Sequence, residues 1–289
     1  MSRDLLTIAG LDAATLTELL DMAERDLGSP MAGQGVAMIF EKPSARTRNS
    51  MEMAAVQLGA HPVYIQKDEV GLGTRENAAD VARSLACYHA VIAARVARHA
   101  DLDAMAGATE TPVLNMLSER AHPLQALADL LTIRQLAGRI EDVRVAYVGD
   151  ANNVARSLAE GCALLGAELI VASPDGYGFS ATELAGLPGV RQVVDPGEAV
   201  RGARVVYTDV WVSMGQADEV AARRDAFAGY QVTPELMAGG DDAWFLHCLP
   251  AHRGEEVAAE VIDGARSAVW RQAENRMHTA RAALAWLVS

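Results

Sequence analysis

The sequence predicts an α/β protein built from two doubly wound parallel-sheet domains. Short apolar runs typical of buried strands alternate with segments of helical periodicity, and this alternation indicates parallel sheets covered by helices. The pattern is interrupted at Gly138–Asp142 and then starts again. We therefore expect one domain at 1–138 and a second at 142–271, with a last helix at 272–289 that packs back on the first.

The composition indicates a globular, soluble protein. The 289 residues are enough for two hydrophobic cores, and the net charge of −13 argues against nucleic acid or a membrane surface as a partner. No apolar run is long enough to span a bilayer, and the first residues do not resemble a signal peptide. The three cysteines are far apart in the sequence, which favours a reducing, cytoplasmic location.

The first domain is expected to hold alternating helices and strands. Apolar side chains recur three and four residues apart in the helices, whereas the strands are short continuous apolar runs. In chain order the predicted elements are helix Leu11–Leu27, strand Val36–Ile39, helix Met51–Leu58, strand Pro62–Ile65, helix Glu76–Cys87, strand Ala90–Ala94, helix Leu102–Ala106, strand Thr111–Asn115 and a helix that opens at His122.

The second domain repeats this organisation with more strands. Its predicted elements are strand Arg144–Val148, helix Val154–Leu165, strands Glu168–Ala172, Val190–Val193, Arg204–Thr208 and Ala243–His247, and the last helix Gln272–Leu287.

The segment Phe40–Arg48 joins the first strand to a helix and carries hydroxyl and guanidinium groups. Free backbone N–H groups and the positive end of the helix dipole favour an anion at such a turn. Arg46 adds a planar fork that fits phosphate. The alternative is an ordinary capped helix start with surface arginines.

Two further polar sites of the first domain lie at a strand end and at a helix start. Arg95 follows the strand Ala90–Ala94, and ligands of open α/β sheets bind at the carboxyl ends of strands. His122 precedes Pro123, a residue suited to the first helical position, so His122 is expected at or near the N-cap with Gln125 on the same face. A helix N-terminus favours a neutral imidazole, which can donate to a carbonyl oxygen. Both side chains otherwise have purely structural interpretations.

The turn Gly149–Asn153 opens the second domain. Its position resembles a dinucleotide-binding turn, but the G-x-G-x-x-G spacing is absent, so NAD is only weakly indicated. Asn152 and Asn153 either hold the turn or bind a carboxylate or amine.

Two more strand ends of the second domain carry polar groups. They are Asp209–Gly215 and His247–Arg253, which bring a carboxylate, a hydroxyl and a thiol to the rim of the sheet. The spacing of His247, Cys248 and His252 matches no common zinc pattern, so we expect no metal. Cys248 as a small buried residue is the structural alternative.

Six motifs in order resemble those of the aspartate/ornithine carbamoyltransferase family. Together they extend over nearly the whole chain, and a chance match of six motifs in the family's order is improbable. They are FEKPSARTR (Phe40–Arg48), HPLQALADLLT (His122–Thr132), GDANN (Gly149–Asn153), DVWVSMGQ (Asp209–Gln216), HCLPAHRGEEV (His247–Val257) and AENRMH (Ala273–His278).

The resemblance implies transfer of a carbamoyl group from carbamoyl phosphate to L-ornithine. It implies an active site in the cleft between the two domains, without metal or organic cofactor, and a division of roles among the residues. By resemblance, Ser44, Ala45, Arg46 and Thr47 hold the phosphate; Arg95, His122 and Gln125 bind the carbamoyl group; Asn153, Asp209, Ser213 and Met214 hold the amino-acid end of ornithine; Cys248 and Leu249 face its side-chain amine; and Arg276 lies near the reacting carbonyl.

The resemblance also implies a homotrimer in which a loop near Gln66–Glu76 completes the phosphate site of a neighbouring subunit. Two positions depart from the family pattern: Ala45 replaces a usual Thr, and Gly71 replaces a Gln or His, for which Thr74 or Arg75 would have to substitute. Alternatives are a carbamoyltransferase for putrescine, acylated ornithine or aspartate, an NAD-dependent oxidoreductase, and an inactive relative that acts as a binding subunit.

Overall fold

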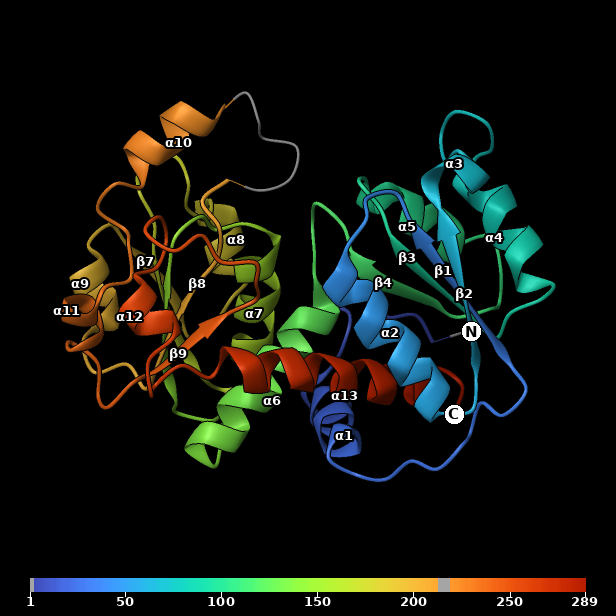
Figure 1. Cartoon of the computed structure of the whole chain (residues 1–289), viewed down its shortest axis with the longest axis horizontal. Helices are drawn as coiled ribbons and strands as arrows, with labels where there is room; N and C mark the ends of the chain where they lie inside the picture. The colour runs from blue at the N-terminus through green and yellow to red at the C-terminus, as the bar shows by residue number, and fades with distance from the viewer. Residues whose placement is uncertain (1–2, 213–218) are drawn as a thin grey trace. The chain divides into compact units, whose positions relative to one another are not determined.

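The computed structural model describes residues 3–212 and 219–289 and divides the chain into two compact α/β units (Figure 1). The first unit comprises Met1–Ala128 and Asn275–Ser289, and the second comprises Asp129–Glu274. The chain therefore enters the second unit within one helix and returns to the first within another.

The first unit is built on a parallel sheet of order β2-β1-β3-β4. Leu5 pairs with Leu114 beyond β4, so β2 forms the open edge of the sheet. Its elements are α1 (Ala13–Ala23), β1 (Gly35–Phe40), α2 (Ala45–Gln57), β2 (His61–Gln66), α3 (Lys67–Val70), α4 (Ala78–Ala86), β3 (Val91–Arg95), α5 (His99–Ala106), β4 (Val113–Leu117) and the start of α6 (Pro123–Ala137).

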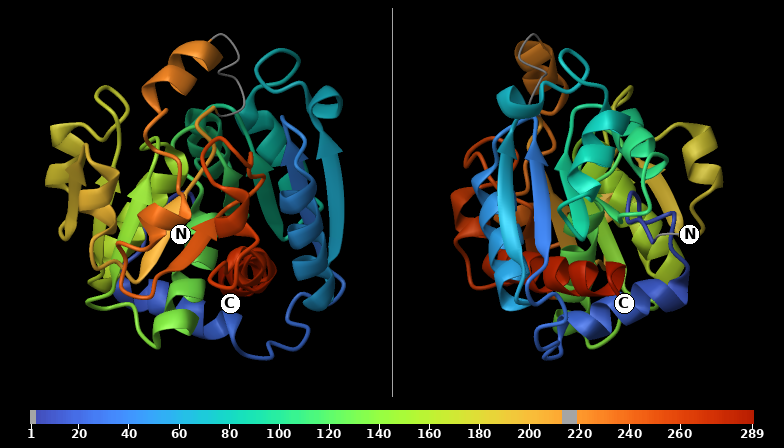
Figure 2. Two further views of the ribbon diagram at one scale, coloured as in Figure 1. Left: turned by 60° about the vertical axis from the view of Figure 1, so that its left-hand side comes forward. Right: turned by 90° about the vertical axis from the view of Figure 1, so that its right-hand side faces the viewer.

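The second unit is built on a parallel sheet of order β7-β6-β5-β8-β9. The views in Figure 2 show the strands side by side within each unit, with helices against them. Its elements are β5 (Arg144–Val148), α7 (Asn153–Leu165), β6 (Glu168–Ala172), α8 (Ala181–Ala185), β7 (Val190–Val193), α9 (Pro196–Val200), β8 (Val205–Thr208), α10 (Val220–Ala226), α11 (Pro234–Met237), β9 (Trp244–His247), α12 (Ala259–Ile262) and the start of α13 (Val269–Leu287).

The predicted fold class is confirmed, because both sheets are parallel and each is connected through helices. The central strands β1 and β3 are almost entirely buried, as their continuous apolar runs require. Each unit has its own apolar core: one groups Ile39, Ile92 and Leu102, and the other groups Val148, Val206 and Phe245.

The helix predicted at Leu11–Leu27 is shorter than expected. Asp12 caps its N-terminus by accepting a hydrogen bond from the Thr15 N–H. The helix ends at Ala23, where the backbone N–H of Glu24 donates to the Asp21 carbonyl. Beyond this end the carboxylate of Asp26 accepts from the Gly28 N–H, and Gly28 has a φ of 61°, so the chain turns there. The short helices α3 and α8–α12 were not predicted, because fewer than two full helical turns leave too little periodicity.

No helix among residues 3–212 and 219–289 combines the length and apolar character that a membrane span requires.

Candidate functional site

The turn between β1 and α2 is shaped by hydrogen bonds between its own hydroxyl groups. Ser44 is the N-cap of α2: its Oγ accepts from the Thr47 N–H at 3.4 Å and donates to Thr47 Oγ1 at 3.1 Å. Arg95, the last residue of β3, donates from Nη1 to Thr47 Oγ1 at 3.4 Å. The structure therefore brings three predicted phosphate and carbamoyl residues together at the carboxyl edge of the sheet.

The two arginines of this turn have different surroundings. Arg48 pairs with Glu52 at 2.8 Å and lies over the Tyr64 ring, 4.0 Å from its centroid. Arg46 is exposed, and no hydrogen bond or ion pair to it is found within the described ranges 3–212 and 219–289. Its fork is therefore available for a ligand anion, as predicted for Arg46 rather than Arg48.

His122, Gln125 and Arg276 form a second group in the first unit. All three are nearly buried, and the carbonyl of His122 accepts from the Gln125 N–H at 3.0 Å, which confirms that His122 immediately precedes α6. Burial, with the positive charges of Arg276 and Arg95, lowers the pKa of His122 well below its usual range. His122 is therefore neutral near pH 7 and can donate one ring N–H to an oxygen.

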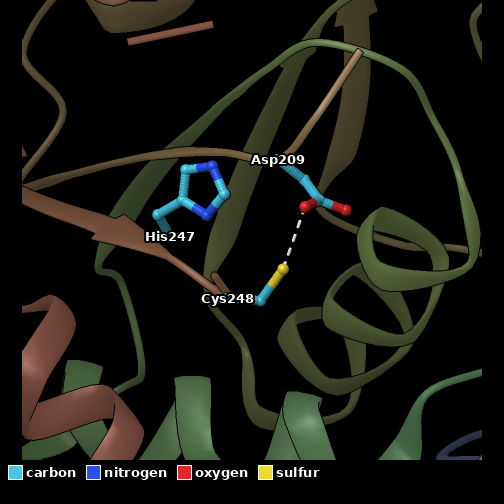
Figure 3. Close-up of side chains that lie close together, drawn as sticks. All are labelled: Asp209, His247 and Cys248. Atoms are coloured by element: carbon cyan, nitrogen blue, oxygen red, sulfur yellow. Dashed lines mark hydrogen bonds between the residues drawn. The ribbon is translucent and has the colours of Figure 1, made fainter. Parts of the chain in front are cut away.

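A carboxylate and a thiol meet in the second unit (Figure 3). Asp209 follows β8 and Cys248 follows β9, so neighbouring parallel strands end beside one another. Cys248 Sγ donates to Asp209 Oδ1 at 3.0 Å, and Asn152 Nδ2 donates to Asp209 Oδ2 at 2.9 Å. Both oxygens of a nearly buried carboxylate are thus oriented by side chains of the unit.

Two of the remaining predicted ornithine residues are described by the structure. Asn153 is the first residue of α7 and Leu249 follows Cys248, both half-buried. Ser213 and Met214 lie outside the described residues.

Asn152 was a weaker candidate in the sequence than Asn153, yet it is the residue that orients Asp209. Its Oδ1 accepts from the backbone N–H groups of Val154 and Ala155, so the same side chain caps α7 and presents its NH₂ to the carboxylate. An N-cap asparagine in the turn between a strand and a helix is the signal that points to this role.

Arg223 was not predicted at all. It is 7% exposed and donates to Asp150 Oδ2 at 2.8 Å, to the Trp211 carbonyl at 3.1 Å and to Glu219 Oε2 at 2.8 Å. No sequence pattern distinguishes it from Arg224, because burial depends on the tertiary fold.

Asp209, His247 and Cys248 offer three possible metal-ligand atoms within 4.8 Å of one another. His247 Nδ1 accepts from the Leu249 N–H at 2.8 Å, and Nε2 lies 3.1 Å from Glu256 Oε1. Both ring nitrogens are engaged, so a metal ion at this group would require His247 to give up one of these bonds.

The two positions that depart from the family pattern have clear local roles. Ala45 is the first residue of α2, where a backbone N–H has no partner within the helix. Gly71 has a φ of 60°, and a Cβ there would lie 2.7 Å from the Cβ of Arg75, so the turn requires glycine. Thr74 and Arg75, which follow, are exposed.

These features define a two-unit α/β protein with polar side chains at the carboxyl ends of its strands, where open α/β sheets bind small molecules. One unit has a turn suited to an anion, and the other has a carboxylate–thiol pair. Family models match both units: the carbamoyl-P binding domain of aspartate/ornithine carbamoyltransferase at residues 3–135, and the Asp/Orn binding domain at 141–287. The chain belongs to the aspartate/ornithine carbamoyltransferase family.

Individual relatives agree with this assignment. The chain is 46% identical over 300 residues to ornithine carbamoyltransferase of Thermus thermophilus, covering 100% of this chain and 97% of the relative. It is 48% identical over 287 residues to that of Acidothermus cellulolyticus, covering 96% and 92%. The solved structure of the Pyrococcus furiosus enzyme has a TM-score of 0.93 and 42% identity, covering 98% of this chain and 96% of that one.

Proposed function

We propose that this chain transfers the carbamoyl group from carbamoyl phosphate to the side-chain amine of L-ornithine, giving L-citrulline and phosphate. The main observation in support of an amine acceptor is the 3.0 Å hydrogen bond from Cys248 Sγ to Asp209 Oδ1, because a carboxylate beside a thiol suits an amine. Relatives that share the fold are named ornithine carbamoyltransferase, and that of Pyrococcus furiosus is named anabolic. The proposed role is accordingly in arginine biosynthesis.

In this proposal the first unit binds the carbamoyl donor. The hydroxyl-rich turn and its free guanidinium hold the phosphate, and the buried group near His122 holds the carbamoyl oxygen and nitrogen. Arg276 lies near the reacting carbonyl group in this proposal. The proposed donor-binding residues are Ser44, Ala45, Arg46, Thr47, Arg95, His122 and Gln125.

The second unit binds ornithine. Asp209 pairs with the α-ammonium group, while Cys248 and the backbone of Leu249 contact the side-chain amine. The proposed ornithine-binding residues are Asn153, Asp209, Ser213, Met214, Cys248 and Leu249.

The reaction forms one C–N bond and breaks one C–O bond. The side-chain amine, with an ordinary pKa near that of lysine, about 10.4, first loses a proton. Its lone pair attacks the carbamoyl carbon, and the oxygen of the tetrahedral intermediate gains negative charge that Arg95, Arg276 and the neutral His122 stabilise. Collapse expels phosphate with the bonding electron pair, and the nitrogen loses its second proton, leaving citrulline.

The test is citrulline formation from carbamoyl phosphate, with L-ornithine, putrescine, N-acetylornithine and L-aspartate as parallel acceptors. We expect saturable turnover with ornithine and little with the other three, since putrescine lacks the amino-acid end that Asp209 is proposed to meet. Turnover with putrescine alone would support carbamoyl phosphate as the donor but would contradict ornithine as the acceptor. No turnover with any acceptor would contradict the proposal.

We further propose a homotrimer in the cytoplasm. Met53 and Val56 on α2 are exposed apolar side chains, and β2 is an open sheet edge, both common at subunit contacts. The three free cysteines suit a reducing compartment. Light scattering on the purified chain should give three times the chain mass, and a monomer mass would contradict the trimer.

A further inference from the structure

The turn that carries Cys248 and Leu249 is held by His247 and Glu256, two residues outside the proposed ornithine-binding set. Both side chains are fully buried. In Figure 3 the thiol of Cys248 points to Asp209, while no hydrogen bond joins the ring of His247 to either. The imidazole therefore serves a different purpose from the thiol–carboxylate pair.

The hydrogen bonds of His247 fix its tautomer. Nδ1 lies 2.8 Å from the Leu249 backbone nitrogen, and because that nitrogen is a donor, Nδ1 must be the unprotonated acceptor. The ring proton is then on Nε2, which faces Glu256 Oε1 at 3.1 Å. The imidazole thus connects a buried carboxylate to the backbone of the turn.

Leu249 needs this support, because its φ of 62° lies in the left-handed region. For a residue with a side chain this conformation is unfavourable, because the Cβ lies too close to the backbone carbonyl oxygen. The hydrogen bond from the Leu249 N–H to His247 Nδ1 offsets part of that cost and sets the direction of the Leu249 carbonyl.

Glu256 is itself fixed. Its Oε1 also accepts from the His252 N–H at 2.6 Å, so one oxygen fastens both ends of the segment between His247 and His252. Burial alone would raise the pKa of Glu256, but hydrogen bonds from His247 and from backbone amides outweigh it and lower the pKa below its usual range. Glu256 is therefore an ionised acceptor at neutral pH.

The backbone of His247 is held separately. Its N–H donates to Gln272 Oε1 at 2.9 Å, and Gln272 Nε2 donates to Asp129 Oδ1 at 2.7 Å. The position of His247 is thus set through its backbone, and only its ring transmits the position of Glu256 to Leu249.

We infer that His247, oriented by Glu256, is a positioning residue that sets the Leu249 backbone and the Cys248 thiol for the amine acceptor. The inference rests on the proposed function, since it assigns these atoms to the acceptor. It predicts that kcat depends more on a hydrogen-bond acceptor at the position of Nδ1 than on the size of the side chain.

Two substitutions of His247 distinguish the roles of its two ring nitrogens. In His247→Asn, the side-chain oxygen can still accept from a backbone N–H two residues on, as in an Asx-turn. In His247→Gln, the amide reaches toward Glu256 instead, and the Leu249 N–H loses its acceptor. We expect kcat to fall about a hundredfold in His247→Gln, the scale of an approximately 1 Å misplacement, and by less than about tenfold in His247→Asn. The KM for carbamoyl phosphate should not change in either variant.

Glu256→Gln tests the carboxylate without removing volume. It keeps an acceptor oxygen but loses the charge, so we expect kcat to fall about tenfold, the difference between a charged and a neutral hydrogen bond. An unchanged kcat would show that Glu256 does not orient His247. This variant also tests the inference if His247→Gln does not fold.

Alkylation of Cys248 by iodoacetamide provides a readout that does not need turnover. It is measured in a Cys87→Ser background, because Cys87 is exposed whereas Cys162 is buried. We expect Cys248 in His247→Asn to be alkylated at the parent rate, and Cys248 in His247→Gln to be alkylated at a different rate. Equal kcat and equal alkylation in the two variants would overturn the inference. An inactive parent with unequal alkylation would overturn only the proposed function.

Discussion

Replacing Asp209 by asparagine is expected to lower kcat/KM for L-ornithine about a hundredfold, since a hydrogen bond to a charged group contributes roughly 1.5–3 kcal/mol. The carboxylate now accepts from Cys248 Sγ at one oxygen and from Asn152 Nδ2 at the other. An asparagine can accept at only one of these atoms, and it has no charge for the α-ammonium group. The measurement is steady-state kinetics with each substrate varied in turn.

The effect should be confined to the acceptor. The KM for carbamoyl phosphate should remain at its parent value, because the proposed donor residues belong to the first unit. Asp225→Asn is the matched control, an exposed aspartate of the same unit that should leave all constants unchanged. Near-parent activity in Asp209→Asn would contradict its role, and so would an equal loss in the control.

The fold was largely predictable because its central strands are buried on both faces. The ranges predicted for β5 and β6 agree with the structure residue for residue, since continuous apolar runs between turns leave few alternatives. The range of β7 also agrees, although Arg191 and Gln192 in it are exposed. Short helices such as α9 and α11 were not predictable in this way. Each begins with a proline after a capping residue, a local signal that is weak without tertiary context.

The candidate site was predictable where a motif or the end of a predicted strand marks it. Thr47 belongs to the motif Phe40–Arg48 and Arg95 follows a predicted strand, and the structure joins them at 3.4 Å. Arg223 was not predictable, because its role depends on a distant partner. It contacts Asp150, which is 73 positions away, and no local pattern indicates that bond.

Arg223→Met is expected to lower the Tm of the second unit by about 10 °C, because breaking a buried ion pair costs roughly 3–5 kcal/mol. The guanidinium is nearly buried, bonds to Asp150, Glu219 and the Trp211 carbonyl, and lies 5.0 Å from the centroid of the Tyr177 ring. Removing it leaves the carboxylate of Asp150 buried without its cation. Differential scanning calorimetry measures the change.

The matched control is Arg224→Met, the neighbouring arginine. Arg224 is exposed and pairs with Glu255 at 2.6 Å, and a surface pair of this kind contributes roughly 0–1 kcal/mol. Its Tm should therefore stay within a few degrees of the parent. Equal losses in the two variants would show that the buried network is not the cause.

The pH dependence identifies Asp150 as the origin of the loss. Burial already raises the pKa of Asp150, and hydrogen bonding and the charge of Arg223 oppose that shift. Without Arg223 the pKa rises further, so the folded variant binds a proton that the unfolded chain has released, and stability falls as pH increases through that window. The deficit of Arg223→Met relative to the parent should therefore be smaller at pH 5 than at pH 7.5. Adding Asp150→Asn should recover much of the lost Tm, because the neutral amide needs no buried cation. A deficit that is independent of pH and is not reduced by Asp150→Asn would place the stabilising effect of Arg223 in its contacts with Trp211 and Tyr177 instead.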